Sequence, residues 1–160
     1  MYLRTLRQLQ KAAAKMQNSR IVVVTQEKYA EIIDAAKEIG AEVLINPQPE
    51  RGISSSMQIG LEIAKDADAC LFTVSDQPWL TAETIIALHD AFQSENKGMA
   101  CTVWGEKTGN PCIFSEKYYK ELMAISGDKG GKQIIKKHPE DVAYLKISDE
   151  RELQDVDVPL

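Results

Sequence analysis

Residues 69–78 read Ala-Cys-Leu-Phe-Thr-Val-Ser-Asp-Gln-Pro, an apolar run that stops at an acidic turn. The run 69–74 is short and continuous, which is typical of a strand buried in a parallel sheet. Asp76 follows it, and open α/β sheets bind their ligands outside the carboxyl ends of the strands. This stretch therefore predicts an α/β fold with a carboxylate at its binding edge.

The rest of the chain alternates between two hydrophobic periods. Apolar residues at helical spacing predict helices over 2–16, 29–39, 54–64, 84–92, 115–125 and 131–137. Short apolar runs predict further strands over 21–24, 43–45, 99–103, 111–114 and 142–147. Such alternation favours right-handed βαβ units, so we expect a three-layer α/β/α arrangement with a mostly parallel, Rossmann-like sheet. No repeat or long linker interrupts it, and one domain should cover residues 1–160.

Composition excludes several classes of function. The formal net charge of -5 disfavours nucleic acid and anionic membrane surfaces as partners, because both would repel the chain. No apolar run approaches the roughly 20 residues that span a bilayer, and no secretory signal is evident, so we expect a cytoplasmic protein. Cys70, Cys101 and Cys112 lie in or beside apolar runs without metal-binding spacing, which favours buried free thiols.

Two acidic turns suggest a metal site. Asp76 ends the run described above, and Asp157 lies in a similar Asp-Val-Pro turn near the C-terminus. Paired carboxylates are common oxygen ligands of Mg²⁺, which proteins often hold together with substrate phosphates. Asp155, two residues before Asp157 on an extended segment, would point to the same side and is a weaker candidate. The alternative for Asp76 is an Asx-turn that caps the strand end.

Small polar residues form a second candidate site between the strands at 43–45 and 69–74. Ser54, Ser55 and Ser56 open a helix just after Gly52, so their hydroxyls and nearby amides can recognise a ligand. The alternative is that Ser54 and Ser55 only cap the helix. Asn46 can help to shape the same pocket or act as a turn residue before Pro47.

Two glycine-containing segments follow. Gly109-Asn110-Pro111 fits an ordinary turn between strands, or a loop whose glycine lets a substrate approach closely. The segment 127–131 fits a flexible connection between helices, or a loop whose amides meet a substrate phosphate ahead of a helix. Lys129 and Lys132 would add positive charge to that loop.

These motifs together resemble a known family. Their order and spacing are similar to those of the MobA-like nucleotidyltransferases. Within that family, they most resemble the molybdenum cofactor cytidylyltransferase branch. The matching segments are 46–47, 52–61, 76–78, 109–111, 127–130 and 155–159. The resemblance runs from about residue 21 to residue 159. It implies a fold of the nucleotide-diphospho-sugar transferase type. It also implies transfer of CMP from CTP to a phosphorylated acceptor such as molybdopterin, with release of pyrophosphate.

The resemblance also implies roles for the candidate residues. Asp76 and Asp157 would hold Mg²⁺ against the nucleotide phosphates. The base and ribose would lie against Gly52, Ser55, Ser56 and Asn46, with Ser56 reaching the base because it precedes the Gly60-Leu61 pair by four residues. Gly109 and Asn110 would face the pterin. The preference for CTP over GTP rests on the serine motif.

One family feature is missing from this sequence. Family members begin with a strand and a loop of the type L-A-A-G-x-S-x-R-M-G-x-x-K that holds the triphosphate, whereas this chain opens with the predicted helix at 2–16. We therefore expect the N-terminal strand to be missing and a neighbouring strand edge to promote homo-oligomers. The alternative functions are an inactive nucleotide-binding or interaction remnant of the family and a guanylyl or sugar-phosphate nucleotidyltransferase.

Overall fold

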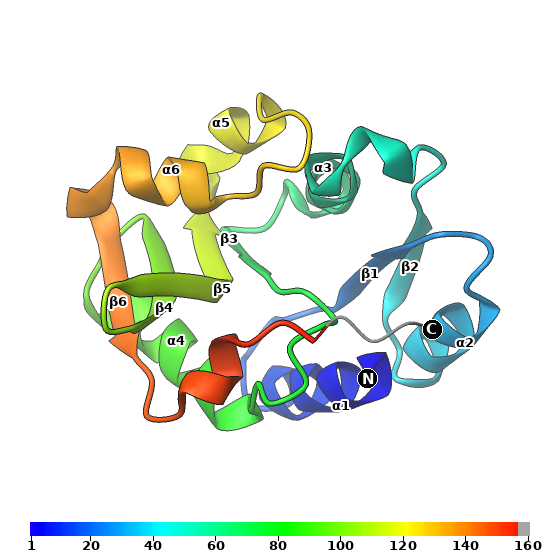
Figure 1. Ribbon diagram of the computed structural model, residues 1–160, viewed down its shortest axis with the longest axis horizontal. Helices are drawn as coiled ribbons and strands as arrows, with labels where there is room; N and C mark the ends of the chain where they lie inside the picture. Colours follow the sequence, from blue (N-terminus) through cyan, green and yellow to red (C-terminus); the bar gives the residue numbers. More distant parts are fainter. Residues whose placement is uncertain (157–160) are drawn as a thin grey trace.

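The computed structural model describes residues 1–156 and shows helices alternating with strands (Figure 1). The strands are β1 (Val22–Thr25), β2 (Glu42–Ile45), β3 (Ala69–Phe72), β4 (Met99–Trp104), β5 (Lys107–Ser115) and β6 (Val142–Lys146). The α-helices are α1 (Tyr2–Ala13), α2 (Ala30–Glu38), α3 (Ile53–Ala64), α4 (Ala82–Ser94), α5 (Tyr119–Met123) and α6 (Lys132–Lys137). Short 3₁₀ turns are η1 (Pro49–Arg51), η2 (Glu116–Tyr118), η3 (Pro139–Asp141) and η4 (Glu150–Leu153). The predicted α/β class is confirmed.

Hydrogen bonding divides the strands into two sheets. β1 pairs with β2 in parallel, and a four-stranded sheet has the order β3-β5-β4-β6. β4 and β6 are also parallel, as expected, but β5 runs antiparallel to both β3 and β4. Its direction follows from the tight turn at Gly105 and Glu106, because a two-residue connection can join only antiparallel strands.

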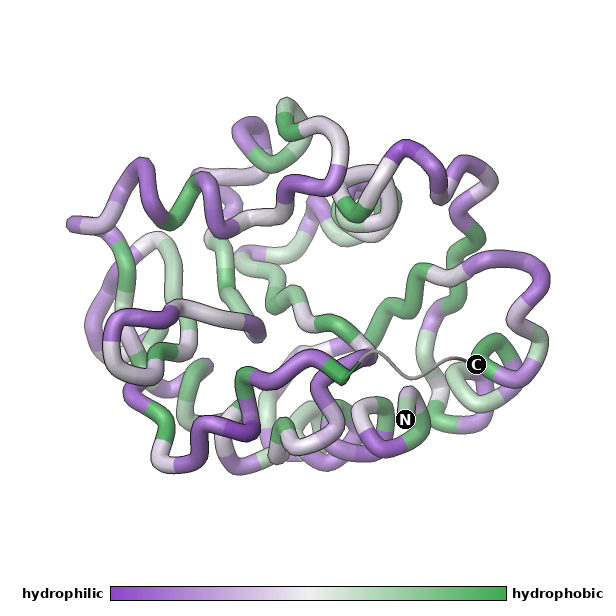
Figure 2. Tube along the Cα trace, in the orientation of Figure 1, coloured by the Kyte–Doolittle hydropathy of each residue, from purple (hydrophilic) through white to green (hydrophobic). Residues whose placement is uncertain are grey.

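Helices cover both faces of the four-stranded sheet. Alternate residues of a strand point to opposite faces, so Met99 and Ala100 of β4 enter different parts of the core. Met99 packs with residues of α5 and α6, whereas Ala100 packs with Leu88 of α4. Figure 2 shows hydrophobic residues concentrated along the strands and hydrophilic ones in the outer loops. This arrangement forms the predicted three layers around an apolar core.

Two helices connect the smaller sheet to the larger one. On one side, α3 contacts both β1 and β3, and a Cβ at Gly60 would lie 3.3 Å from the Val24 side chain. α1 packs against α2 and α4, with Ala12 in a cluster that includes Leu80 and Ile85. All four residues of β1 are only half-buried, whereas residues 99–102 of β4 are fully buried.

The cysteines agree with the expectation of free thiols. Cys70, Cys101 and Cys112 are free thiols, of which Cys101 and Cys112 are buried and Cys70 is half-buried. Burial raises the pKa of Cys101 to about 11, so this thiol is uncharged at neutral pH. Within residues 1–156, no helix has the length and apolar character needed to span a membrane.

Candidate functional site

Asn46 organises a polar cluster at the end of β2. This side chain is 3% exposed, and its Nδ2 donates to Ser55 Oγ and to Ser56 Oγ, each at 2.9 Å. Its Oδ1 accepts a hydrogen bond from Gln48 N at 2.9 Å. Asn46 is therefore the turn residue that the sequence offered as one alternative, while its role in a ligand pocket stays a prediction. The structure brings together three of the predicted site residues, Asn46, Ser55 and Ser56.

Gly52 lets two chain segments cross closely at the start of α3. It occupies the N-cap position with φ 92° and ψ 178°, a conformation that is essentially restricted to glycine. A Cβ here would lie 2.4 Å from the Gly127 carbonyl carbon. Ser54 Oγ donates to Gly127 O at 2.7 Å, and Ser55 Oγ donates to Gly52 O at 2.7 Å. Gly52 is the N-cap and no side chain among residues 1–156 caps α3, so the capping alternative for Ser54 and Ser55 is wrong.

The end of α5 is held against α3 by a residue to which the sequence analysis gave no role. Gln58 Nε2 donates to the carbonyls of Leu122, Met123 and Ile125, the last at 2.6 Å. These carbonyls lie at the end of α5, where helix geometry leaves acceptors without intrahelical partners. The segment 127–131 lies beside the serine cluster because Ser54 donates to Gly127 O. Lys129 and Lys132 are exposed there, and their predicted contact with phosphate stays a prediction.

Asp76 lies in the turn that follows β3 and is half-buried. Its carbonyl oxygen accepts a hydrogen bond from Val156 N at 2.8 Å. Next to it, Gln77 Nε2 donates to Asp155 Oδ1 at 3.2 Å. The C-terminal segment thus reaches the turn that bears Asp76, as the paired-carboxylate hypothesis requires. Asp157 itself lies outside the described residues.

Gly109 and Asn110 are strand residues, not members of an ordinary turn. Both belong to β5, and the turn lies earlier, at Gly105 and Glu106. Thr102 Oγ1 is within 3.1 Å of the carbonyl oxygens of Gly109 and of Asn110, at the point where the β4–β5 register shifts. Because Phe72 pairs with Cys112, Asn110 lies just beyond the end of β3, on the side of Asp76.

The candidate residues therefore share one edge of the fold. Asn46 follows β2, Asp76 follows β3, and Asn110 lies beside the end of β3. This carboxyl edge is where α/β sheets bind ligands. Within residues 1–156, no three histidine, cysteine, aspartate or glutamate side chains gather into a metal-binding group. A metal site built on Asp76 consequently depends on Asp157 or on ligand oxygens.

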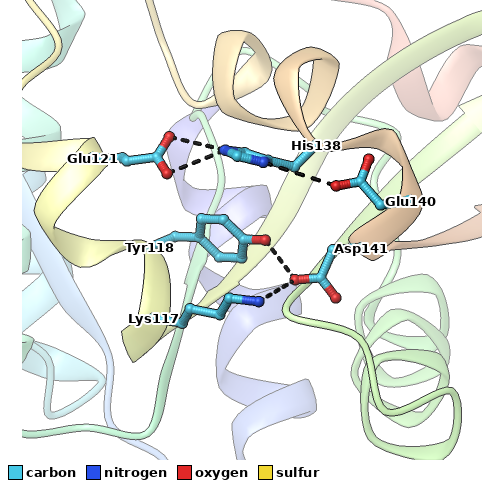
Figure 3. Close-up of a pocket in the computed structure, with 6 residues that line it drawn as sticks. All are labelled: Lys117, Tyr118, Glu121, His138, Glu140 and Asp141. Carbon is cyan, nitrogen blue, oxygen red and sulfur yellow. Dashed lines mark hydrogen bonds and ion pairs between the residues drawn. The ribbon is translucent and has the colours of Figure 1, made fainter.

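A second polar group lies at the opposite edge, before β4 and β6. A cavity of about 500 Å³ is lined by Lys117, Tyr118, Glu121, His138, Glu140 and Asp141 (Figure 3). Asp141 accepts hydrogen bonds from Tyr118 Oη and from Gly98 N, the latter at 3.0 Å. These bonds lower the pKa of Asp141 to about 2. Sequence analysis did not find this group, because residues 117–121 and 138–141 meet only through tertiary contacts.

His138 ties two helices together in the same cavity. Its Nε2 lies 3.1 Å and 3.2 Å from the carboxylate oxygens of Glu121 at the end of α5, and its ring contacts Tyr118. The cavity is separated from the predicted nucleotide residues by the length of the strands. We therefore assign these charges to holding α5, η3 and the start of β6 in place.

Known structures share this fold. Rv0371c of Mycobacterium tuberculosis in complex with manganese aligns with a TM-score of 0.70 and 17% identity, over 91% of this chain and 75% of that one. The nucleotidyl transferase Mth528 of Methanothermobacter thermautotroptrophicus has a TM-score of 0.74 and 19% identity, over 94% and 73%. A cytidylyltransferase of Leptospira borgpetersenii has a TM-score of 0.66 and 15% identity, over 94% and 65%. No curated protein matches the sequence significantly.

The sequence itself identifies the family. Residues 1–142 match the MobA-like NTP transferase domain, which is most of the chain and includes every candidate residue up to Asn110. The fold, the polar carboxyl edge and this match agree with one another. The chain therefore belongs to the MobA-like nucleotidyltransferase family.

Proposed function

We propose that this chain is a Mg²⁺-dependent cytidylyltransferase of the molybdenum cofactor type. In the proposed reaction, a terminal phosphate oxygen of molybdopterin attacks the α-phosphorus of CTP. The new P–O bond joins CMP to the acceptor, and the bond to the β-phosphate oxygen breaks to release pyrophosphate. No side-chain nucleophile is needed, so the residues act by binding and orienting the two substrates.

The observation that carries the proposal is the cluster of Asn46, Ser55 and Ser56. Each serine oxygen accepts a hydrogen bond from Asn46 Nδ2, which leaves each hydroxyl proton for another acceptor. The Ser55 hydroxyl donates its proton to a hydrogen bond with Gly52 O. For Ser56, no intramolecular acceptor is found within residues 1–156, so this hydroxyl is set to donate to a ligand.

A hydroxyl donor favours cytosine over guanine. The pairing edge of cytosine presents the acceptors N3 and O2 beside one amine, whereas guanine presents one acceptor, O6, beside N–H donors at N1 and N2. Ser56 can donate to the first edge and meets donors on much of the second. Its oxygen is already engaged with Asn46, which limits its capacity to accept from guanine.

Asp76 fits the proposed metal by its chemistry. Carboxylate oxygens are hard ligands that suit Mg²⁺ or Mn²⁺, and Asp157 would supply the second one. The manganese in the Rv0371c structure supports a divalent cation in a protein of this fold. When bound, the ion would neutralise charge on the reacting phosphate oxygens. Gly109 and Asn110, beside the end of β3, would face the acceptor.

Calorimetric titration with CTP, GTP and ATP, each with and without Mg²⁺, tests the nucleotide site. We expect Mg²⁺-dependent binding that favours CTP. Ser56→Ala should reduce the CTP-over-GTP preference about fivefold, since one hydrogen bond contributes on the order of 1 kcal/mol. Asp76→Ala should abolish the effect of Mg²⁺.

Ser54→Ala is the matched control, because the Ser54 hydroxyl is committed to Gly127 O and should not affect base choice. Equal affinity for all three nucleotides, or none, would contradict the cytidylyltransferase assignment. Pyrophosphate release with molybdopterin then tests the acceptor. Release only with GTP or with a sugar phosphate would favour the guanylyl or sugar-phosphate alternative.

A further inference from the structure

The segment 127–131 has no role in the proposed reaction, although it lies against the candidate nucleotide site. Gly127 O accepts hydrogen bonds from Ser54 N at 3.2 Å and from Ser54 Oγ at 2.7 Å. At the other end of the segment, a Cβ on Gly131 would collide with the ring of Phe114. In Figure 1 the connection between α5 and α6 runs beside α3. Both ends of the segment are therefore held in place.

Asp128 brings a carboxylate against Gly52. Its Oδ1 would lie 2.7 Å from a Cβ at Gly52, so only the absence of a side chain there makes room for it. Asp128 is exposed, and no hydrogen bond or ion pair to its carboxylate is found within residues 1–156. An ionised carboxylate accepts hydrogen bonds and cannot donate them. A hydrogen-bond acceptor thus lies open beside the candidate nucleotide site.

A continuous chain of contacts links Asp128 to the residue that carries the base preference. Ser56 Oγ accepts from Asn46 Nδ2, which also donates to Ser55 Oγ, each at 2.9 Å. Ser55 Oγ donates to Gly52 O at 2.7 Å, and Gly52 lies against Asp128. Ser56 follows Gly52 by four residues, which is about 6 Å along a helix. A nucleoside with its base at Ser56 can therefore place its sugar beside Gly52 and Asp128.

The charge of Asp128 decides which part of a nucleotide it can bind. Phosphate oxygens are negatively charged acceptors, so a carboxylate repels them. A ribose carries two neighbouring hydroxyl donors, and a carboxylate has two oxygens that can accept from them. Acidic side chains bind ribose hydroxyls in this way in dinucleotide-binding folds. For Asp128, sugar hydroxyls are therefore better partners than the phosphate that the sequence suggested for this segment.

We propose that Asp128 is a specificity-determining residue: its carboxylate accepts hydrogen bonds from the ribose hydroxyls of CTP, so that the site prefers ribonucleotides. This inference rests on the nucleotide site of the proposed function. It extends that site to the connection between α5 and α6. It also adds a sugar contact to the base contact at Ser56.

Calorimetric titration with CTP and with 2′,3′-dideoxy-CTP, both with Mg²⁺, tests the proposal. We expect the wild-type chain to bind CTP about tenfold more tightly, because hydrogen bonds to charged groups are stronger than those between neutral groups. Asp128→Ala should bring the ratio of the two affinities close to one. A structural role of Asp128 would not change this ratio, since unfolded chains lower the binding of both nucleotides alike.

Glu50→Ala is the matched control. It removes another exposed carboxylate, two residues before Gly52 in the sequence, and should keep the wild-type ratio. Equal binding of the two nucleotides by the wild-type chain would overturn the inference and leave the proposed cytidylyltransferase in place. A preference that survives in Asp128→Ala, or that Glu50→Ala removes equally, would also overturn the inference. A wild-type chain that binds no cytidine nucleotide would overturn the proposed function and this inference with it.

Discussion

β4 and β1 are both short apolar strands, yet they differ in burial. Residues 99–102 of β4 are buried, whereas β1 is half-buried throughout. β4 has a strand on each side, while β1 pairs only with β2 within the described residues. The difference shows that an apolar, β-branched run predicts a strand, but neighbouring strands decide how deeply it is buried.

The backbone of β1 shows the same difference in its hydrogen bonds. The carbonyl of Ile21 accepts from Glu42 N of β2 at 2.9 Å, and the carbonyl of Thr25 accepts from Asn46 N, just after β2, at 2.8 Å. Backbone groups alternate in direction along a strand, so the N–H and C=O groups of Val22 and Val24 point away from β2. In β4, by contrast, β5 and β6 occupy both sides.

The largest effect should come from the core of the four-stranded sheet. Phe114, 1% exposed, packs with Phe72 and Met99, so Phe114→Ala should lower the free energy of unfolding by about 3–5 kcal/mol. Val23→Ala in half-buried β1 should cost about 1–2 kcal/mol. Urea unfolding followed by circular dichroism measures both values. Equal losses in the free energy of unfolding would contradict the expectation that the four-stranded sheet contributes more to stability than the two-stranded one.

An intermediate effect on stability is expected where the start of α3 crosses the segment 127–131, at Gly52 and Gly127. Gly52→Ala should destabilise the fold by about 2–3 kcal/mol, because it combines an unfavourable φ with a backbone clash. Gly105→Ala is the control, since its φ is also positive, at 58°, but no atom of the described residues lies within 4 Å of the added Cβ. Thermal unfolding should therefore show a smaller loss for Gly105→Ala. If the two variants match, the crossing at Gly52 adds nothing beyond backbone strain.

The smallest perturbation is isotope exchange, which changes no residue. The amides of Val22 and Val24 should exchange about tenfold or more faster than that of Val23, whose N–H points toward β2. Hydrogen exchange followed by NMR resolves the three positions. Uniform protection would mean that another strand covers this edge in solution, and sedimentation at several concentrations would then show whether a second copy supplies it.

The family resemblance predicts that Asn46, Ser55 and Ser56 line one pocket, and the structure joins these side chains by direct hydrogen bonds. Their contact with a nucleotide stays a prediction. Gln58 and Gln77 received no role. A glutamine has the same appearance in a sequence whether it faces water or a distant backbone carbonyl, so their partners became visible only in the fold.

The sequence by itself determined the α/β class, the order of the elements and the edge at which the polar residues gather, because hydrophobic period and turn residues act locally. Only the tertiary structure decided the antiparallel direction of β5 and the place of Gly109 and Asn110 within it. It also decided the half-burial of β1 and the hydrogen bond between Gln77 and Asp155. These features depend on which segments become neighbours. That choice is made by packing between residues far apart in the chain, which no local pattern encodes.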